Sequence, residues 1–347
     1  MGFDFTRKWL NRKPEGPELV SAKPGRPWLL MVTSEKRNQN YYRDVELARR
    51  FSTIWISEAF PFSQYGYDLK EIVGRLSPSQ QIDWVWVNYR HSFTAKLSGW
   101  EELGAPVAAF VGDPHDFIRT EPRFKQKIDF FHYLRPEILI NPYPNANGLV
   151  RPVMNGAQTP MVGCYWAVPT RIFRPQGRWR RYDIGCLGSH TPGTYPFRNQ
   201  VREYLLAQRR LKFFKKLRVC GHDGVIFSRA LNRLRASFTC ASIYQYTLMK
   251  YFEIPACGTL LFAEPTPDLE ALGFRDGENF VAVSPDNFIE KMEHYLIAAP
   301  EEMVRISQAG VELINQRHTW EKRVTGLVRA IARHLKTKWP EDVYQEN

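Results

Sequence analysis

Short apolar runs alternate with helical patterns along most of the chain. Between the helical patterns at 41–51, 67–76 and 121–134, apolar runs of five to eight residues indicate buried strands. Strands that are apolar throughout and separated by helices are typical of βαβ units, whose parallel sheet is buried on both faces. The strands expected in this first half lie at 27–34, 52–57, 82–89, 105–112 and 137–143.

The alternation stops over residues 142–181, where Pro, Gly, Asn and Arg are frequent, and we expect a linker there. A second alternation follows, with strands at 182–189, 213–221, 236–242, 259–264 and 279–284 and helices at 195–211, 225–235, the segment leading into Glu253, and 285–298. The helix at 195–211 is predicted to have Val201, Leu205 and Leu206 on one side. Two further helices close the chain, and the last has an apolar face made of Trp320, Val324, Leu327, Val328, Ile331 and Leu335.

These patterns predict an α/β fold of two Rossmann-like αβα domains that face each other across a cleft. A chain of 347 residues exceeds the size at which a single core stops growing, so two domains are expected. Open α/β sheets bind ligands beyond the carboxyl ends of their strands, and both domains would present such loops to the cleft. The predicted segments are a basic extension (1–26), an N-terminal domain (27–165), a linker (166–181), a C-terminal domain (182–318) and a final helix (319–347) that packs back on the N-terminal domain.

The chain is basic, and its positive charge is unevenly spread. It has 48 Lys and Arg against 36 Asp and Glu, a formal net charge of +12. Between residues 171 and 218, thirteen Lys and Arg stand against two acids, Asp183 and Glu203. This bias fits an anionic partner such as a nucleoside diphosphate, a phosphorylated polymer or an acidic membrane face, and equally well a solvated helix face. No nucleic-acid-binding motif is present, so we expect no nucleic-acid partner.

Two absences favour a cytoplasmic protein. No run approaches the ~18 apolar residues of a membrane span, and residues 1–19 contain no apolar core of a signal peptide. The five cysteines are scattered, odd in number and never spaced as C-x-x-C, so we expect reduced core thiols. The basic surface adds the alternative of a peripheral location at the inner membrane face.

Two stretches at predicted strand ends suit an anionic ligand. Gly188, Ser189 and His190 form a small strand-to-helix turn whose backbone N–H groups could approach a phosphate, although an ordinary βα turn explains them too. The second stretch, "ASIYQYTLMKYFE", contains Tyr246 and Thr247 where a turn opens a helix. Lys250 and Glu253 follow on one helical face, where they could serve a phosphate and a sugar diol, or only pair with each other.

A third stretch, "AAFVGDPHDF", ends a predicted strand in Asp113, Pro114, His115 and Asp116. Asp113 or His115 could act as a general base at the mouth of the cleft, and a strand-end aspartate could equally cap the next helix. We expect no metal, because no distant residues complete a ligand set. A basic run between Arg174 and Arg181 could contact an anionic acceptor or be only a soluble linker.

Residues 246–296, which include "KYFEIPACGTLLFAE", resemble the C-terminal half of GT-B glycosyltransferases, in particular the group-1-like branch with the spore-maturation glycosyltransferase-like proteins. The closing segment "GVELINQRHTWEKRVTGLV", the linker "YWAVPTRIFRP" and the strand end "AAFVGDPHDF" resemble the corresponding parts of the same fold. The likeness covers residues 159–335 well and the N-terminal half only in outline.

The resemblance implies a metal-independent glycosyltransferase (a hexosyltransferase, EC 2.4) that uses a nucleoside-diphosphate sugar, most simply a UDP-sugar, and no other cofactor. The donor would bind the C-terminal domain, and an acceptor, anionic or membrane-linked, the N-terminal domain. Glu253 would hold the donor ribose, and Lys250 would lie near the diphosphate. Gly188, Ser189, His190, Tyr246 and Thr247 would complete the donor site, with Asp113 or His115 as catalytic base.

Two departures from the family pattern leave alternatives open. Many retaining members carry a glutamate eight positions before the ribose ligand, where this chain has Gln245, so inversion is favoured. Lys250 stands where relatives more often have Arg. An ammonium group then takes the place of a guanidinium that could bind a phosphate through two parallel hydrogen bonds. A nucleotide-sugar 2-epimerase of the same fold and a non-catalytic protein that binds sugar nucleotides are the rival hypotheses.

Overall fold

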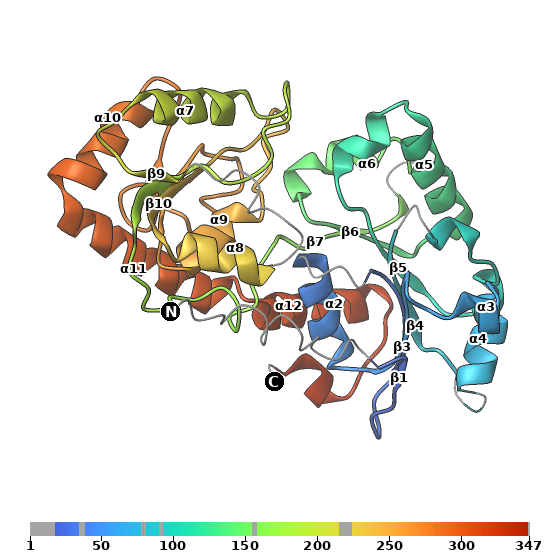
Figure 1. The fold of residues 1–347 in the computed structure, drawn as a ribbon. Helices are drawn as coiled ribbons and strands as arrows, with labels where there is room; N and C mark the ends of the chain where they lie inside the picture. The colour runs from blue at the N-terminus through green and yellow to red at the C-terminus, as the bar shows by residue number, and fades with distance from the viewer. Residues whose placement is uncertain are drawn as a thin grey trace, which may run out of the picture.

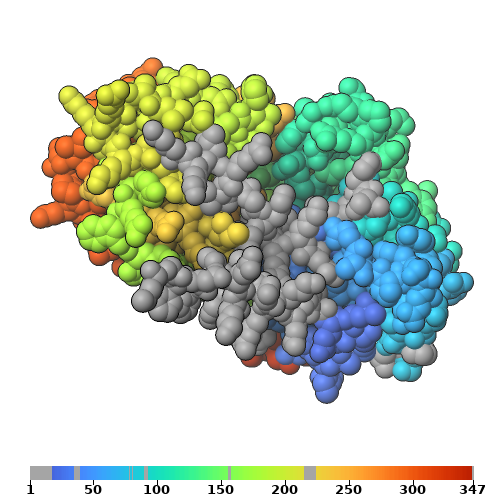
Figure 2. All heavy atoms as spheres, viewed as in Figure 1, coloured from blue at the N-terminus to red at the C-terminus, as the bar shows by residue number. Residues whose placement is uncertain are grey.

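Two parallel sheets, each covered by helices, make up the computed structural model (Figure 1). The structure describes residues 18–34, 39–77, 79, 81–89, 93–154, 158–214 and 224–345. We call the part built on the first sheet the N-terminal domain and the part built on the second the C-terminal domain. In the space-filling view they form two lobes, blue to green and yellow-green to orange (Figure 2).

The N-terminal sheet has the strand order β1-β3-β2-β4-β5-β6-β7, and only β1 runs antiparallel to its neighbour. Its central strands are buried along their whole length, as continuous apolar runs predict. The strands are β1 (Val20–Ser21), β2 (Trp28–Val32), β3 (Ser52–Ile56), β4 (Trp84–Asn88), β5 (Val107–Phe110), β6 (Ile138–Asn141) and β7 (Met161–Gly163). The helices are α2 (Gln39–Ala48), α3 (Phe62–Tyr65), α4 (Leu69–Leu76), α5 (Pro122–Leu134) and α6 (Asn147–Val150).

The C-terminal sheet is parallel throughout, in the order β12-β11-β10-β8-β9. Its strands are β8 (Tyr182–Gly185), β9 (Phe213–Phe214), β10 (Leu234–Thr239), β11 (Leu260–Ala263) and β12 (Val281–Ala282). Its helices are α7 (Pro196–Ala207), α8 (Gly224–Leu231), α9 (Lys250–Ala256), α10 (Phe288–Glu293) and α11 (Pro300–Arg317). The doubly wound α/β architecture expected from the alternating pattern is confirmed.

After α11 the chain returns to the N-terminal domain as α12 (Trp320–His334), which lies against α2. The crossing is fixed by Val168, whose N–H donates to the carbonyl of His318 (3.0 Å) and whose carbonyl accepts from the N–H of Trp320 (3.1 Å). The buried guanidinium of Arg50 on the N-terminal side donates to the hydroxyl of Thr325 on α12 (2.9 Å). The two domains are therefore joined by two passes of the chain.

His318 lies buried at this crossing, between two partners. Its Nε2 donates to the carbonyl of Leu272 (2.8 Å), and its Nδ1 accepts from Nη2 of Arg323 (2.8 Å). Burial, reinforced by the charge of Arg323, lowers the pKa of His318 to about 3. The ring is therefore neutral at pH 7 and acts as a structural link between the C-terminal domain and α12.

Three local expectations from the pattern are wrong. The stretch 142–181 is not irregular throughout, because β7 pairs with β6 inside it, and β1 pairs with β3 where only an extension was expected. Leu206 does not share the buried side of α7: it is 41% exposed, whereas Val201 and Leu205 are buried. Most of the strand predicted at 213–221 lies outside the described residues.

Candidate functional site

The loop between β8 and α7 passes directly against two cations. Gly188 in this loop has φ +136°, a conformation that L side chains rarely adopt. A Cβ at this position would lie 2.8 Å from Cε of Lys250 and 3.0 Å from Nη1 of Arg198. Only a glycine lets the backbone of the loop approach both side chains so closely.

Arg198 holds this loop through a hydrogen bond to its backbone and was not among the predicted site residues. It is fully buried; Nη1 donates to the carbonyl of Ser189 (2.8 Å), and Nη2 donates to the hydroxyl of Thr239 at the end of β10 (3.3 Å). Its guanidinium lies over the ring of Tyr195 at 4.1 Å. Within the described part of the chain, nothing accepts a hydrogen bond from its Nε. The sequence does contain a signal for Arg198. It lies three positions before Val201 and seven before Leu205, and so falls on the apolar face of α7.

The next two predicted residues of the loop have local partners. The hydroxyl of Ser189 lies 2.6 Å from that of Thr191, and both are exposed. Nδ1 of His190 lies 3.0 Å from Oδ1 of Asn199. Burial lowers the pKa of His190, although the bond to Asn199 opposes this shift, so its ring is neutral at pH 7. Ser189 and His190 shape the loop and add no positive charge.

Helix α9 contributes Lys250 and Glu253. Lys250 lies against Gly188, as the near contact of its Cε shows, and its Nζ lies 5.9 Å from the ring centre of Phe227. Glu253, one turn later, is 7% exposed. The helix ends at Ala256, and after Cys257 the chain passes through Gly258 in the left-handed conformation (φ +65°) before β11. The structure thus brings the Gly188 loop and Lys250 together, with Glu253 buried on the same helix.

The turn between β10 and α9 crosses towards the N-terminal domain. Gln245 has a positive φ (56°), its side chain is exposed, and its carbonyl accepts from Nδ2 of Asn145 in the other domain (3.1 Å). Thr247 is fully buried, with its hydroxyl 2.5 Å from that of Thr266. Thr247 therefore holds the turn in place and has no open face for a ligand.

Stacked rings from the two domains meet next to this turn. The ring of His115 stacks on Tyr244 (centroids 4.0 Å apart, 8° between planes), and Tyr143 stacks on Tyr246 (4.1 Å, 12°). The backbone N–H of His115 donates to the hydroxyl of Tyr246 (3.2 Å). The loop after β5 and the turn before α9, predicted separately as acceptor and donor sites, are therefore in contact.

Asp113 immediately precedes the short 3-10 helix η3 (Pro114–Ile118), but its side chain caps no N–H group of that helix. The capping alternative is therefore wrong. Asp113 is solvent-exposed, although the surrounding protein lies close to its carboxyl group. Desolvation by this protein raises its pKa, and the charge of Asp116 adds to the shift. Burial raises the pKa of Tyr143, Tyr195 and Tyr246, and the charge of Asp113 adds to each shift, so the carboxylate lies near rings from both domains.

His115 is a poorer candidate for a base than Asp113 in this arrangement. Its ring is half-buried, and burial lowers its pKa even though Asp113 and Asp116 oppose the shift. One ring face is covered by Tyr244, and its Nε2 lies 3.9 Å from Oδ1 of Asp116. The carboxylate of Asp116 is itself held by Nζ of Lys127 (2.8 Å). His115 thus packs as a neutral ring, whereas the carboxylate of Asp113 is open to solvent.

The basic run between Arg174 and Arg181 contains one residue that turns inward. Nη2 of Arg180 donates to the carbonyl of Cys257 and Nη1 to the hydroxyl of Thr259, both at 2.9 Å, next to the start of β11. Arg180 therefore joins the linker to the C-terminal sheet.

The described residues contain neither a metal-binding cluster nor a membrane-spanning helix. No group of three or more His, Cys, Asp or Glu side chains there could hold a metal ion. None of the described helices is both long and apolar enough to cross a membrane. The described cysteines are buried free thiols (Cys164, Cys186, Cys240 and Cys257).

Comparisons with known proteins match the chain to glycosyltransferases. Residues 170–329 match the family model described as Glycosyl transferase-like, whereas no curated protein sequence matches. HepE from Anabaena, solved with UDP and glucose, has a TM-score of 0.60 at 10% identity, covering 88% of this chain and 100% of its own. A glycosyltransferase from Rickettsia africae (TM-score 0.60) and sucrose-phosphate synthase from Thermosynechococcus elongatus (0.58) are each 12% identical, covering 90% of this chain and 100% of their own. The fold is thus the GT-B fold, as the sequence predicted.

Proposed function

We propose that the chain is a glycosyltransferase that moves a sugar from a UDP-sugar to an acceptor hydroxyl. One observation carries the proposal: the Gly188 loop at the carboxyl end of β8 lies against the cations Lys250 and Arg198, and Asp113 of the other domain lies near Tyr195 at the end of the same loop. The family match over residues 170–329 and the fold shared with HepE, which binds UDP-glucose, support this reading. The finer assignment to the spore-maturation branch rests on the sequence resemblance alone.

In the proposed mechanism the C-terminal domain stabilises the leaving diphosphate. The backbone N–H groups of Gly188 and Ser189 and the ammonium of Lys250 would receive the charge that develops on the phosphate oxygens. Arg198 would add a fixed positive charge behind the loop and hold Ser189 in place. Because two side-chain cations supply this charge, we propose that the reaction needs no bound metal. Glu253 would accept hydrogen bonds from the ribose hydroxyls.

On the other side of the cleft, Asp113 would remove the proton from the acceptor hydroxyl. The oxygen then attacks the anomeric carbon as the bond to the diphosphate breaks, which inverts the anomeric configuration. A carboxylate whose pKa is raised by its surroundings is a stronger base than one with the ordinary pKa. Many retaining relatives have a charged glutamate at the position of Gln245. The side chain of Gln245 is uncharged, which agrees with inversion.

Ligand-induced stabilisation tests the donor. At about 100 times its dissociation constant, UDP should stabilise the protein by ~2.7 kcal/mol, which a thermal-shift measurement resolves readily. A series of nucleoside diphosphates and their sugars would then identify the base and the sugar. No stabilisation by any of them would contradict the proposal. Conversion of the UDP-sugar without an acceptor would favour the epimerase, and binding without turnover a non-catalytic protein.

Replacing Glu253 by glutamine tests the ribose contact. A hydrogen bond to a charged group contributes about 1.5–3 kcal/mol, so the affinity for UDP should fall roughly tenfold to a hundredfold in the variant. The matched ligand is 2′,3′-dideoxy-UDP, which lacks both hydroxyls. Wild-type protein should bind it much more weakly than UDP, and the variant should bind the two alike when measured by calorimetry. If Glu253→Gln folds normally and still prefers UDP to the dideoxy ligand, Glu253 does not hold the ribose.

A further inference from the structure

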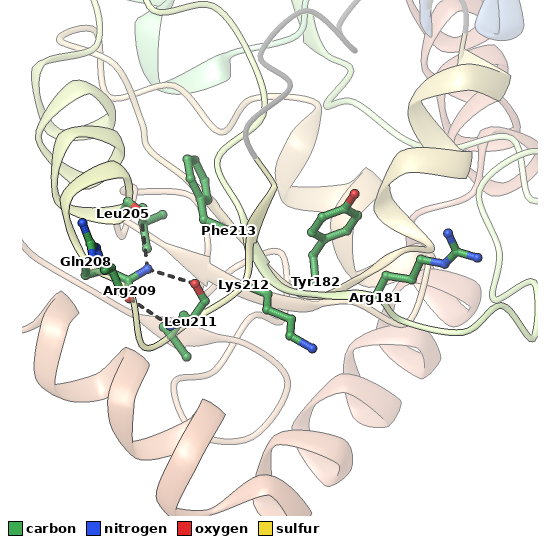
Figure 3. Close-up of a pocket in the computed structure, with 8 residues that line it drawn as sticks. All are labelled: Arg181, Tyr182, Leu205, Gln208, Arg209, Leu211, Lys212 and Phe213. Atoms are coloured by element: carbon green, nitrogen blue, oxygen red, sulfur yellow. Dashed lines mark hydrogen bonds between the residues drawn. The ribbon is translucent and has the colours of Figure 1, made fainter.

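The C-terminal domain has a basic hollow at the end opposite the donor loop. It lies where β8 and β9 begin, beside the last turn of α7, and has a volume of about 400 Å³. Arg181, Arg209 and Lys212 line it together with apolar parts of Leu205 and Leu211. Figure 3 shows Arg181 and Lys212 extending outward from the starts of the two strands, with Arg209 on the far side. Since β8 and β9 are parallel, the hollow and the Gly188 loop lie at opposite edges of one sheet.

A tryptophan close in sequence to this hollow has its ring in solvent. Trp179 is 83% exposed and lies two residues before Arg181. Arg180 between them is turned inward by its bonds to Cys257 and Thr259, so Trp179 and Arg181 both remain on the outside. A fully exposed indole has a large apolar area in water and prefers the boundary between water and hydrocarbon.

Among the residues that the structure describes, no ion pair or side-chain hydrogen bond involves the charged groups of Arg181, Arg209 or Lys212. The nearby carboxylate of Asp183 accepts from the backbone N–H of Lys212 (2.9 Å) and pairs with Arg235. Leu206, which follows the lining residue Leu205 on α7, exposes 41% of its surface. We call Trp179, Arg181, Leu206, Arg209 and Lys212 the basic aromatic surface, in which exposed apolar side chains accompany three cations without a described ion pair.

We propose that the basic aromatic surface docks the protein onto a membrane that contains anionic phospholipids. Trp179 and Leu206 would enter the boundary between head groups and acyl chains, while the three cations contact lipid phosphates, one of which the hollow can accept. The exposed aliphatic side chain of Leu206, which cannot stack on a base, favours a bilayer over a nucleic acid. Because the surface and the donor loop lie at opposite ends of the sheet, docking leaves the cleft open to solvent.

Vesicle sedimentation tests the proposal on the full-length protein. With vesicles of phosphatidylcholine and phosphatidylglycerol in equal parts, we expect salt-sensitive binding that vesicles of phosphatidylcholine alone do not support. The double variant Arg181→Glu/Lys212→Glu should lower the partition coefficient at least about tenfold, since each basic residue near the surface contributes to binding. The variant Arg329→Glu/Arg333→Glu on α12 is the matched control, because it changes the same charge at two exposed positions elsewhere. It should bind almost as wild type does.

Insertion of the indole gives a second readout. The fluorescence of wild-type protein should shift to shorter wavelength on addition of the anionic vesicles, and this shift should be lost in Trp179→Phe. Equal losses in the two double variants would overturn the proposal, because binding would then follow net charge alone. So would binding to neutral vesicles, or a fluorescence shift that survives in Trp179→Phe. If Arg181→Glu/Lys212→Glu binds RNA more weakly than wild type does but binds the vesicles equally well, the surface is a nucleic-acid site instead.

Discussion

Replacing Gly188 by alanine should lower the rate of sugar transfer about a hundredfold, because displacing catalytic groups by about 1 Å has effects of that size. The added Cβ would lie 2.8 Å from Lys250 and 3.0 Å from Arg198, so both side chains must move away from the loop. Since these cations would stabilise the charge that develops on the leaving diphosphate, kcat should fall more than the affinity for UDP. Steady-state kinetics together with UDP titration by calorimetry would separate the two.

Gly193→Ala provides the control for backbone strain. Gly193 lies in the same loop with φ +76°, but nothing lies within 4 Å of the Cβ it would gain. Both substitutions force an L side chain into an unfavourable conformation at a cost of about 1–3 kcal/mol of stability. Only Gly188→Ala should also lose activity. Equal activity in the two variants would mean that the contact of the loop with Lys250 and Arg198 has no part in catalysis.

The order of strands and helices could be predicted from the chain because buried parallel strands are apolar throughout. The errors arose where that signal is weak. β7 has three residues and lies in a stretch rich in Pro, Gly and Asn, so its pairing with β6 is decided by tertiary contacts. Leu206 was assigned to the buried side although five positions on a helix turn it by about 140° from Val201.

The site could be predicted less completely than the fold, because its parts meet only through the packing of the two domains. The Gly188 loop and Lys250 were expected near one phosphate, and the structure places them in contact. That His115 stacks on Tyr244 follows from how the domains face each other, which no local pattern encodes. The sequence analysis did not single out Arg198, because it lies in a basic stretch and was counted there only as part of the net charge. Its place on the apolar face of α7 was the signal against that interpretation.

Replacing Asp113 by asparagine should lower kcat about a hundredfold to ten-thousandfold, the usual contribution of a general base. Only the ionised carboxylate can accept the proton of the acceptor. Because desolvation and Asp116 raise the pKa of Asp113 above its ordinary value of 3.8, the rate of the wild-type enzyme should begin to fall at a higher pH than for an exposed aspartate. This acidic limb of the pH–rate profile should be absent from the residual activity of Asp113→Asn. His115→Gln should retain it; if the limb is lost there instead, the base is His115.

Stability provides a readout of Asp113 that does not depend on turnover. Its folded-state pKa is raised, so the folded protein holds the proton to a higher pH than the unfolded chain does. Ionisation therefore disfavours the folded state, and this penalty appears as the pH rises from the unfolded pKa through the folded one. Asp113→Asn should accordingly be more stable than wild type at pH 7 and no more stable below the unfolded pKa, when compared by denaturant titration. A carboxylate kept at a cost in stability is typical of a group retained for its chemistry.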